Sequence, residues 1–192
     1  MGGARMLEQI GKYRQVITLS DGTRVLLRPL TAEDKNALIA MFEPTSADDL
    51  RSMRNDVRNR EMIGKWAEDV DYKKVFPLLA VVNDRIVGDA SLHFRSGPSR
   101  HIADVRIFLT KEFRRRGLGS AMLRAVIDAA RKAGLQQIVA EIVADQAKVV
   151  SAFQQLGFEL RATYTDYFMM PDGEPHDVVV LILRLAPKRE EF

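Results

Sequence analysis

The chain has 192 residues, of which 46% are hydrophobic and 29% charged, and its formal net charge is +3. These values are typical of a globular protein that buries a full core without disulfides or structural metals. The absence of cysteine excludes disulfides, thiolate nucleophiles and cysteine-ligated zinc, and His93, His101 and His176 lack the spacing of metal ligands.

Localisation and partner classes follow from the same composition. No apolar run reaches the roughly 20 residues that a membrane-spanning helix requires, and Glu8 interrupts the segment where a signal peptide would lie. We therefore expect a soluble, cytoplasmic protein with no membrane partner. The modest positive charge lacks the dense basic stripe of nucleic-acid-binding proteins. We therefore expect no nucleic-acid partner, and either a monomer or a homodimer.

The first half of the chain is predicted to contain two hairpins separated by helices. Asp21-Gly22 and Asn83-Asp84 are turn sequences between segments rich in β-forming residues. Thr31 is a helix N-cap candidate followed by acidic residues, and Pro44 ends that helix. In chain order, we expect strands at residues 16–19 and 23–28, helices at 31–42, 46–54 and 59–68, and strands at 76–82 and 86–94.

The second half alternates strands and helices. After a strand at residues 102–109, apolar residues recur with helical spacing from Leu118 to Ala129, and Gly134 is a candidate C-cap. The remaining expected elements are strands at 138–144, 158–165 and 177–185, a helix capped by Asp145 and ending near Gly157, and a turn at Pro171-Asp172-Gly173-Glu174. This order predicts an α/β fold with one mixed sheet. We expect a single domain over residues 1–192, with residues 1–14 as an N-terminal extension.

The segment that follows the strand at 102–109 has the features of an anion-binding loop. It reads Arg114-Arg115-Arg116-Gly117-Leu118-Gly119-Ser120 and leads into an amphipathic helix. A helix start offers unpaired backbone N–H groups and the positive end of the helix dipole. The two glycines leave these groups open to a phosphate, and the arginines add positive charge where a diphosphate would lie.

Other phosphate motifs fit this segment less well. It lacks the Gly-Lys-Ser/Thr ending of a Walker loop. Ala121 and Met122 follow where a dinucleotide fingerprint needs its third glycine. A surface turn with solvated arginines is the alternative explanation. The succession of strand, three arginines, spaced glycines and amphipathic helix favours anion binding.

This loop resembles the cofactor motif of the GNAT N-acetyltransferase superfamily, Gln/Arg-x-x-Gly-x-Gly/Ala, through Arg114, Gly117 and Gly119. The resemblance covers about residues 15–186 and is strongest to bacterial protein lysine acetyltransferase domains. It implies the GNAT fold, a single mixed and mostly antiparallel sheet with splayed parallel central strands and flanking helices. It also implies acetyl-CoA (coenzyme A) as cosubstrate, without a metal. The thioester would lie in a V-shaped opening between residues 105–109 and 138–144.

The resemblance assigns roles to individual residues. Backbone groups of residues 107–109 are expected to contact the pantetheine arm, and the N–H groups of residues 114–120 to hold the pyrophosphate. Gln146 stands where many family members have asparagine and can hydrogen-bond the pantetheine amides. The expected cofactor-binding residues are Ile107, Phe108, Leu109, Arg114, Arg115, Arg116, Gly117, Leu118, Gly119, Ser120, Gln146 and Phe153.

Phe153 departs from the family pattern. It stands where many members have the tyrosine that protonates the leaving thiolate, and a phenyl ring has no proton to donate. Water or another donor could serve, and Tyr164 and Tyr167 are candidate replacements.

Two carboxylates are candidates for the base that receives the proton of the attacking amine. Strand alternation places Asp104, Arg106 and Phe108 on one face, and Ala103-Asp104 resembles the Ala-Glu pair of some family members. An ion pair between Asp104 and Arg106 is the alternative. Glu141 interrupts an apolar strand and lies either on a solvated face or in the cleft.

Residues 46–72 are expected to form one wall of the acceptor site, as this region often does in GNAT-like proteins. Trp66 is expected in a helix core, with a pocket wall as the alternative. His93 is expected to make a structural hydrogen bond, with lining of the acceptor pocket as the alternative.

Three functions follow from these predictions. The first is transfer of an acetyl group from acetyl-CoA to a primary amine, on a protein lysine or a small molecule, by direct attack in a ternary complex. The second is a non-catalytic acyl-CoA sensor, which Phe153 favours. The third is an unrelated nucleotide- or nucleic-acid-binding protein.

Overall fold

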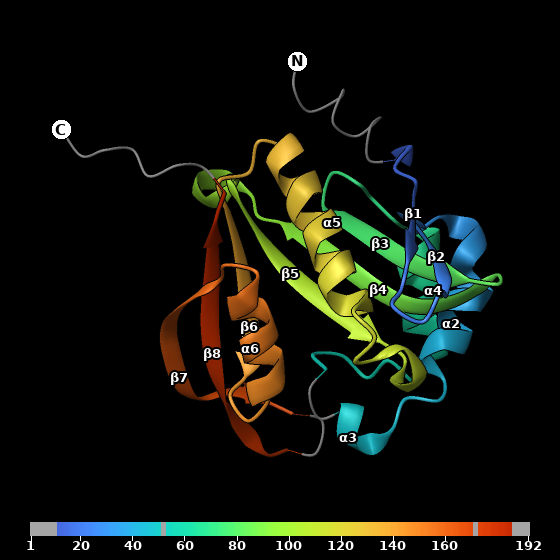
Figure 1. Cartoon of the computed structure of the whole chain (residues 1–192). Helices are drawn as coiled ribbons and strands as arrows, with labels where there is room; N and C mark the ends of the chain where they lie inside the picture. Colours follow the sequence, from blue (N-terminus) through green and yellow to red (C-terminus); the bar gives the residue numbers. More distant parts are fainter. Residues whose placement is uncertain (1–10, 51–52, 171–172, 186–192) are drawn as a thin grey trace.

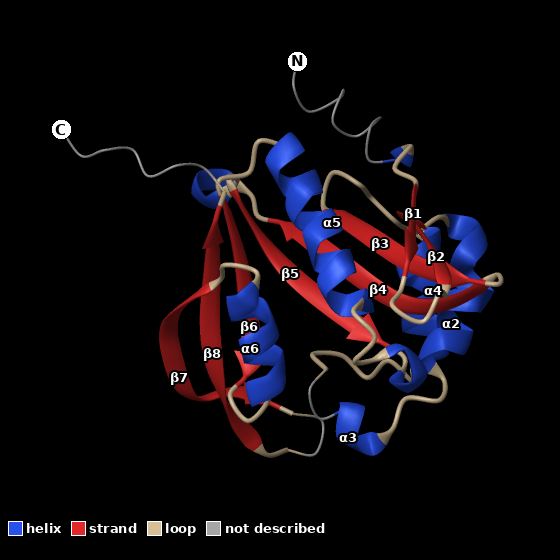
Figure 2. Ribbon diagram, in the orientation of Figure 1, coloured by secondary structure: helices blue, strands red, loops and turns tan. Residues whose placement is uncertain are grey.

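The structure is a computed structural model that describes residues 11–50, 53–170 and 173–185. These residues form an eight-stranded sheet in the order β1-β2-β3-β4-β5-β6-β8-β7, and Figures 1 and 2 show helices on both of its faces. The strands are β1 (Gln15–Thr18), β2 (Arg24–Pro29), β3 (Val75–Val82), β4 (Arg85–Phe94), β5 (Ile102–Leu109), β6 (Gln137–Val143), β7 (Glu159–Met169) and β8 (Pro175–Arg184).

The helices cover the sheet as two separate layers. They are α2 (Lys35–Phe42), α3 (Ala47–Leu50), α4 (Arg60–Glu68), α5 (Leu118–Lys132) and α6 (Ala147–Gln155), with single 3-10 turns η1 (Ala32–Asp34), η2 (Gly97–Ser99) and η3 (Lys111–Phe113). One buried cluster joins α5 and Phe153 of α6 to the sheet, and a second joins α2 and α4 to its other face. β3 is apolar along its whole length because both of its faces are buried.

The sheet is antiparallel except at its centre. β5 and β6 run parallel and pair only at Ile102↔Gln137, Ala103↔Ile138 and Asp104↔Val139. Beyond these residues the two strands diverge, as Figure 1 shows. Each strand keeps its other neighbour, because β4 pairs with β5 as far as Leu109 and β8 pairs with β6 as far as Val143. The predicted mixed sheet with splayed central strands is therefore confirmed.

The predicted elements agree with the structure within a few residues, with three differences. The helix predicted at 46–54 is the short α3 (Ala47–Leu50), and residues 51–52 lie outside the described residues. The predicted cap Asp145 is wrong by one residue, because Gln146 turns back to the Val143 carbonyl and precedes α6. The last hairpin is longer than predicted, with β7 extending to Met169. Residues 1–10 of the predicted extension and 171–172 of the predicted turn are also outside the described residues.

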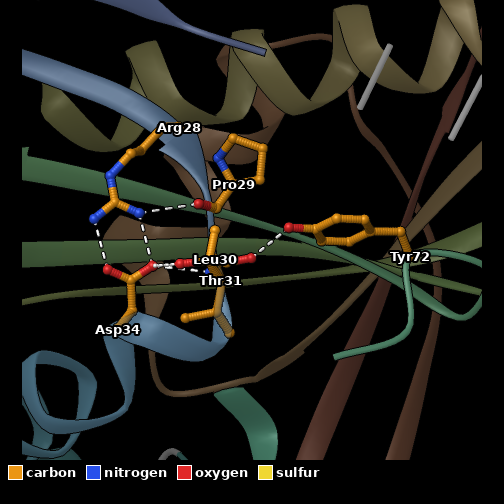
Figure 3. A network of polar contacts seen from close by, with 6 residues as sticks. All are labelled: Arg28, Pro29, Leu30, Thr31, Asp34 and Tyr72. Atoms are coloured by element: carbon orange, nitrogen blue, oxygen red, sulfur yellow. Dashed lines mark hydrogen bonds and ion pairs between the residues drawn. The ribbon is translucent and has the colours of Figure 1, made fainter. Parts of the chain in front are cut away.

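A polar network fixes the corner between β2 and α2 (Figure 3). Arg28 donates to both carboxylate oxygens of Asp34, at 2.7 and 2.6 Å. Asp34 also accepts from the backbone N–H and hydroxyl of Thr31, which forms a capping box. Burial opposes ionisation of Asp34, but the bonds from Arg28 and Thr31 outweigh it and keep its pKa below the ordinary value. The Tyr72 hydroxyl donates to the Leu30 carbonyl at 2.5 Å and so ties this corner to the chain before β3.

No helix in the described part of the chain is long and apolar enough to span a membrane.

Candidate active site

A cavity of about 560 Å³ lies where β5 and β6 separate. It passes through the sheet, because it has walls on both faces. Gln146 and Phe153 line it on the α6 side, whereas Phe42 of α2 and Trp66 of α4 line it on the other. The gap needs no break in the strands, since β4 and β8 continue to pair with the outer edges of β5 and β6.

Two of the three β5 residues expected at the pantetheine arm line this cavity, namely Ile107 and Phe108. Leu109 lies at the end of β5, outside the cavity lining. Its carbonyl accepts a hydrogen bond of 2.9 Å from the Arg114 side chain. The loop after β5 is thereby attached to the strand.

In the loop at 114–120, the Arg114 N–H donates to the Lys111 carbonyl at 3.3 Å, and the loop N–H groups that follow it are free in the part of the chain that the structure describes. Gly117 precedes α5 with a φ of 83°, a left-handed conformation that favours glycine. Ala121 is the first residue of this region whose N–H bonds back to the turn, to the Gly117 carbonyl at 3.1 Å. Among the described residues, the N–H groups of residues 115–120 have no protein acceptor. This arrangement can receive the oxygens of a phosphate.

The three arginines of the loop differ in their contacts. Arg114 pairs with Asp49 of α3 at 2.7 Å. Arg116 forms an ion pair with Asp21, donates to the Thr23 hydroxyl at 2.9 Å, and lies over the Phe113 ring. Arg115 is exposed, has a φ of 58°, and makes no ion pair within residues 11–50, 53–170 and 173–185. Two of the three guanidinium groups are therefore engaged inside the protein, and Arg115 remains available to an anion.

Gly119 has a packing role that the sequence did not indicate. A Cβ at this position would meet the Leu109 side chain at 3.3 Å and the Ile107 side chain at 3.8 Å. The glycine thus allows the first turn of α5 to approach β5 closely. Leu118 is fully buried beneath the same turn.

The structure gives Phe153 a core position. Its side chain is 3% exposed and packs edge-to-face on Phe158, with ring centroids 5.0 Å apart. Tyr164 and Tyr167 stack on one another on β7, with 47% and 52% of their surfaces exposed. Neither tyrosine lines the cavity, so neither replaces the missing hydroxyl within it.

Both carboxylates predicted as bases have arginine partners. Asp104 accepts two hydrogen bonds from Arg95, at 2.9 and 2.5 Å. The alternative prediction, an ion pair between Asp104 and Arg106, is wrong, because Asp104 pairs with Arg95, the residue that follows β4. Asp104 also lies at the closed end of the opening, where β5 still pairs with β6, and does not line the cavity. Glu141 does line the cavity, and it pairs with Arg54 at 2.6 Å.

A third carboxylate, Asp89 of β4, was missed from the sequence. It lines the cavity, and its Oδ1 is buried without a hydrogen-bond partner among the described residues. Burial raises the pKa of Asp89 to about 7, although Arg106 acts in the opposite direction. A polar residue at every second position, Asp89, Ser91 and His93, marks this strand face in an otherwise apolar segment. This alternation of polar residues was the sequence signal that could have identified Asp89 as a candidate site residue.

The neighbouring polar groups belong to the same face of β4 and β5. The register places His93 opposite Asp104, Ser91 opposite Arg106, and Asp89 opposite Phe108. His93 lies 3.1 Å from the Ser91 hydroxyl and also lines the cavity, so both roles considered for it hold. Burial, together with Arg106, lowers the pKa of His93 to about 4, so its ring is neutral near neutral pH.

The helices above this face supply apolar walls. Trp66 is 37% exposed, lines the cavity, and packs edge-to-face on Phe42. It is therefore a wall of the cavity, and the expectation of a helix-core position is wrong. Phe42 in turn packs on Phe108, with ring centroids 5.0 Å apart, and Phe168 of β7 lines the far side.

A fold with a parallel pair that splays over such a cavity, followed by a glycine loop at a helix start, defines the class of acyl-CoA acyltransferases related to GNAT enzymes. The family profile described as "Acetyltransferase (GNAT) domain" matches residues 24–159. The chain belongs to this GNAT acetyltransferase domain family.

Individual relatives are similar over part or most of the chain. The L-amino acid N-acetyltransferase AaaT of Escherichia coli K12 is 26% identical over 105 residues, which cover 53% of this chain and 65% of that protein. The chain thus spans slightly less than two thirds of that relative's length. The GNAT domain of S. lividans PAT is 19% identical, with a TM-score of 0.75 over 90% of this chain and 97% of that one.

A second solved structure, yncA of Salmonella typhimurium with its cofactor acetyl-CoA, is 21% identical. Its TM-score is 0.72, over 88% of this chain and 98% of that one. At these identities, the two structures establish the shared fold.

Proposed function

We propose that this protein is an acetyl-CoA-dependent N-acetyltransferase that acetylates a primary amine by direct attack in a ternary complex. The observation that carries the proposal is the cavity through the splayed sheet. One of its sides lies beside a loop of unpaired N–H groups, and the other holds an unpaired carboxyl group. The names of the relatives, one an N-acetyltransferase and one a structure with acetyl-CoA, support the same activity.

The residues at the two sides of the cavity fit an acyl-CoA. The free N–H groups of residues 115–120 and the Arg115 side chain would hold the pyrophosphate. Ile107 and Gln146, on opposite sides of the gap, would flank the pantetheine arm. Acetyl-CoA supplies the thioester carbonyl that the amine attacks, so that a C–N bond replaces the C–S bond and the thiolate leaves and takes up a proton.

Asp89 is the group best placed to receive the amine proton. It is unpaired, whereas Asp104 is bound to Arg95 and Glu141 to Arg54. Its pKa of about 7 lets it be ionised at neutral pH and still hold a proton well enough to accept one. We therefore propose Asp89 as the base in place of Asp104 and Glu141.

The test is release of CoA thiol from acetyl-CoA across a panel of primary amines, for the wild type, Asp89→Asn, Asp104→Asn and Glu141→Gln. We expect Asp89→Asn to lower kcat by about 100-fold or more while the Kd for CoA stays unchanged, because loss of a general base affects chemistry and not cofactor binding. A greater loss in Asp104→Asn or Glu141→Gln would move the assignment to that residue.

A non-catalytic acyl-CoA sensor is the second candidate, because Phe153 lacks the hydroxyl that would protonate the thiolate. The same assay separates the two functions. Binding of CoA without thiol release for any amine would establish the sensor and refute the transferase.

A further inference from the structure

The α2–α4 side of the cavity contains a guanidinium group without a counter-ion. Arg106 lines the cavity, its Nε is buried without a hydrogen-bond partner, and it forms no ion pair in the described part of the chain. The two nearest carboxylates on β5 and β6 are already bound, Asp104 to Arg95 and Glu141 to Arg54. Arg106 is half-buried, and leaving its buried Nε–H unpaired is costly unless an acceptor from outside completes it.

Asp89 is the complementary group on the neighbouring strand. Its Oδ1 is also buried without a partner, and it forms no ion pair with Arg106 or with any other described residue. Because Asp89 is opposite Phe108 and Ser91 is opposite Arg106, Asp89 and Arg106 are diagonal neighbours on one face. In antiparallel pairs such neighbours have Cα atoms about 7–8 Å apart. One carboxyl and one guanidinium therefore face the cavity side by side, without satisfying each other.

We propose that the acceptor is an amine that also carries a carboxylate, of the amino-acid type. Its nitrogen would lie at Asp89 and its carboxylate at Arg106. This inference rests on the proposed acetyl transfer and specifies its acceptor. A lysine side chain of a protein brings an amine without a carboxylate, and would leave Arg106 unpaired. A free amino acid satisfies both buried groups at once, since its two charged ends are separated by a single carbon.

The remaining walls indicate an apolar side chain on this acceptor. Phe42, Trp66, Phe168 and Leu38 line the same cavity as the polar pair. The other charged groups that line the cavity are the Arg54–Glu141 pair on one side, and Lys65, Asp69, Asp71 and Lys74 from α4 and the segment that leads into β3. These last four contribute two charges of each sign, so they favour neither an anionic nor a cationic side chain. We therefore expect a neutral one.

The experiment compares matched acceptors with acetyl-CoA and the full chain. They are L-phenylalanine, its carboxamide L-phenylalaninamide, and Nα-acetyl-L-lysine amide as the model of a protein lysine. We expect kcat/KM for L-phenylalanine to exceed that for its amide by about 10- to 100-fold, the usual value of a charge-assisted hydrogen bond. The lysine model is expected to be the poorest acceptor.

The variant arm identifies the residue responsible. Arg106→Gln should remove the preference for the carboxylate, so that the ratio of kcat/KM for L-phenylalanine to kcat/KM for its amide falls by about 10- to 100-fold. Comparing this ratio between the variant and the wild type cancels the different amine pKa values of the two acceptors. The matched control is Arg100→Gln, at an exposed arginine that follows η2 and does not line the cavity. It should retain the wild-type ratio.

Binding provides a readout that is independent of turnover. In the presence of CoA, L-phenylalanine should raise the Tm of the wild type and of Arg100→Gln but not of Arg106→Gln. Equal kcat/KM for L-phenylalanine and its amide, or an unchanged ratio in Arg106→Gln, would overturn the inference while leaving acetyl transfer intact. Absence of thiol release with every amine tested would refute the proposed function instead. The binding arm would then still decide whether Arg106 recognises a carboxylate.

Discussion

The three carboxylates near the cavity differ in role because they differ in partners. Asp104 and Glu141 each accept a short hydrogen bond from an arginine, at 2.5 and 2.6 Å, which holds each carboxylate in one orientation. Asp89 has no such partner, and burial is the main influence on its pKa. A paired carboxylate is a poor proton acceptor, since protonation breaks its ion pair. The unpaired carboxylate loses nothing of this kind when it takes up a proton.

The raised pKa of Asp89 makes stability depend on pH in a defined direction. The folded-state pKa of about 7 lies above the ordinary aspartate pKa of 3.8, so ionised Asp89 opposes folding. The penalty is absent below about pH 4, grows between about pH 4 and 7, and is complete above about pH 7. Asp89→Asn should therefore raise the Tm relative to the wild type at about pH 8 by about 5 °C, and the difference should vanish near pH 4. Thermal unfolding across this range measures it, and parallel curves for the two proteins would contradict the raised pKa.

At the scale of elements, side-chain contacts hold the loop between β5 and α5 against neighbouring parts of the protein. Arg114 ties it to α3 through Asp49, and Arg116 ties it to the β1–β2 turn through Asp21 and Thr23. These contacts fix the backbone of a loop in which the N–H groups of residues 115–120 have no acceptor among the described residues. The arginine between them, Arg115, is the exposed one.

Substitution of these arginines should separate binding from stability. Arg115→Gln should weaken CoA binding by about three- to tenfold, the effect of one exposed charge on a phosphate, and leave the Tm unchanged. Arg116→Gln should lower the Tm, because it releases the β1–β2 turn from the loop. Isothermal titration with CoA and thermal unfolding of both variants test this division. This division between a binding arginine and a stabilising one is wrong if Arg115→Gln lowers the Tm or keeps full CoA affinity.

At the scale of the whole molecule, the outer strands and the helices on both faces hold the opening in the sheet in place. β5 keeps its antiparallel partner β4, and β6 keeps β8, while α5 and α6 cover the gap on one face and α2 and α4 flank it on the other. The strand edges that face the gap carry backbone groups that no neighbouring strand satisfies. An extended ligand with amide groups can satisfy them.

Amide hydrogen exchange gives the corresponding prediction. CoA should slow exchange in residues 105–109 and 140–143, which border the gap, and leave β2 and β3 unchanged because they are paired on both sides. Slowing that is uniform over the sheet would indicate general stabilisation and not occupation of the opening.

The sequence by itself determined the elements and their class. Alternating and helical apolar periods located nearly every strand and helix, and the glycine loop indicated where an anion would bind, because these signals are local in the chain. Only the tertiary structure decided which charged side chains are free. Asp104 is paired with Arg95 and Arg114 with Asp49, a partner 65 residues away, whereas Asp89 and Arg106 are unpaired. The charge state and availability of a side chain depend on what packs against it, and those neighbours come from distant parts of the chain.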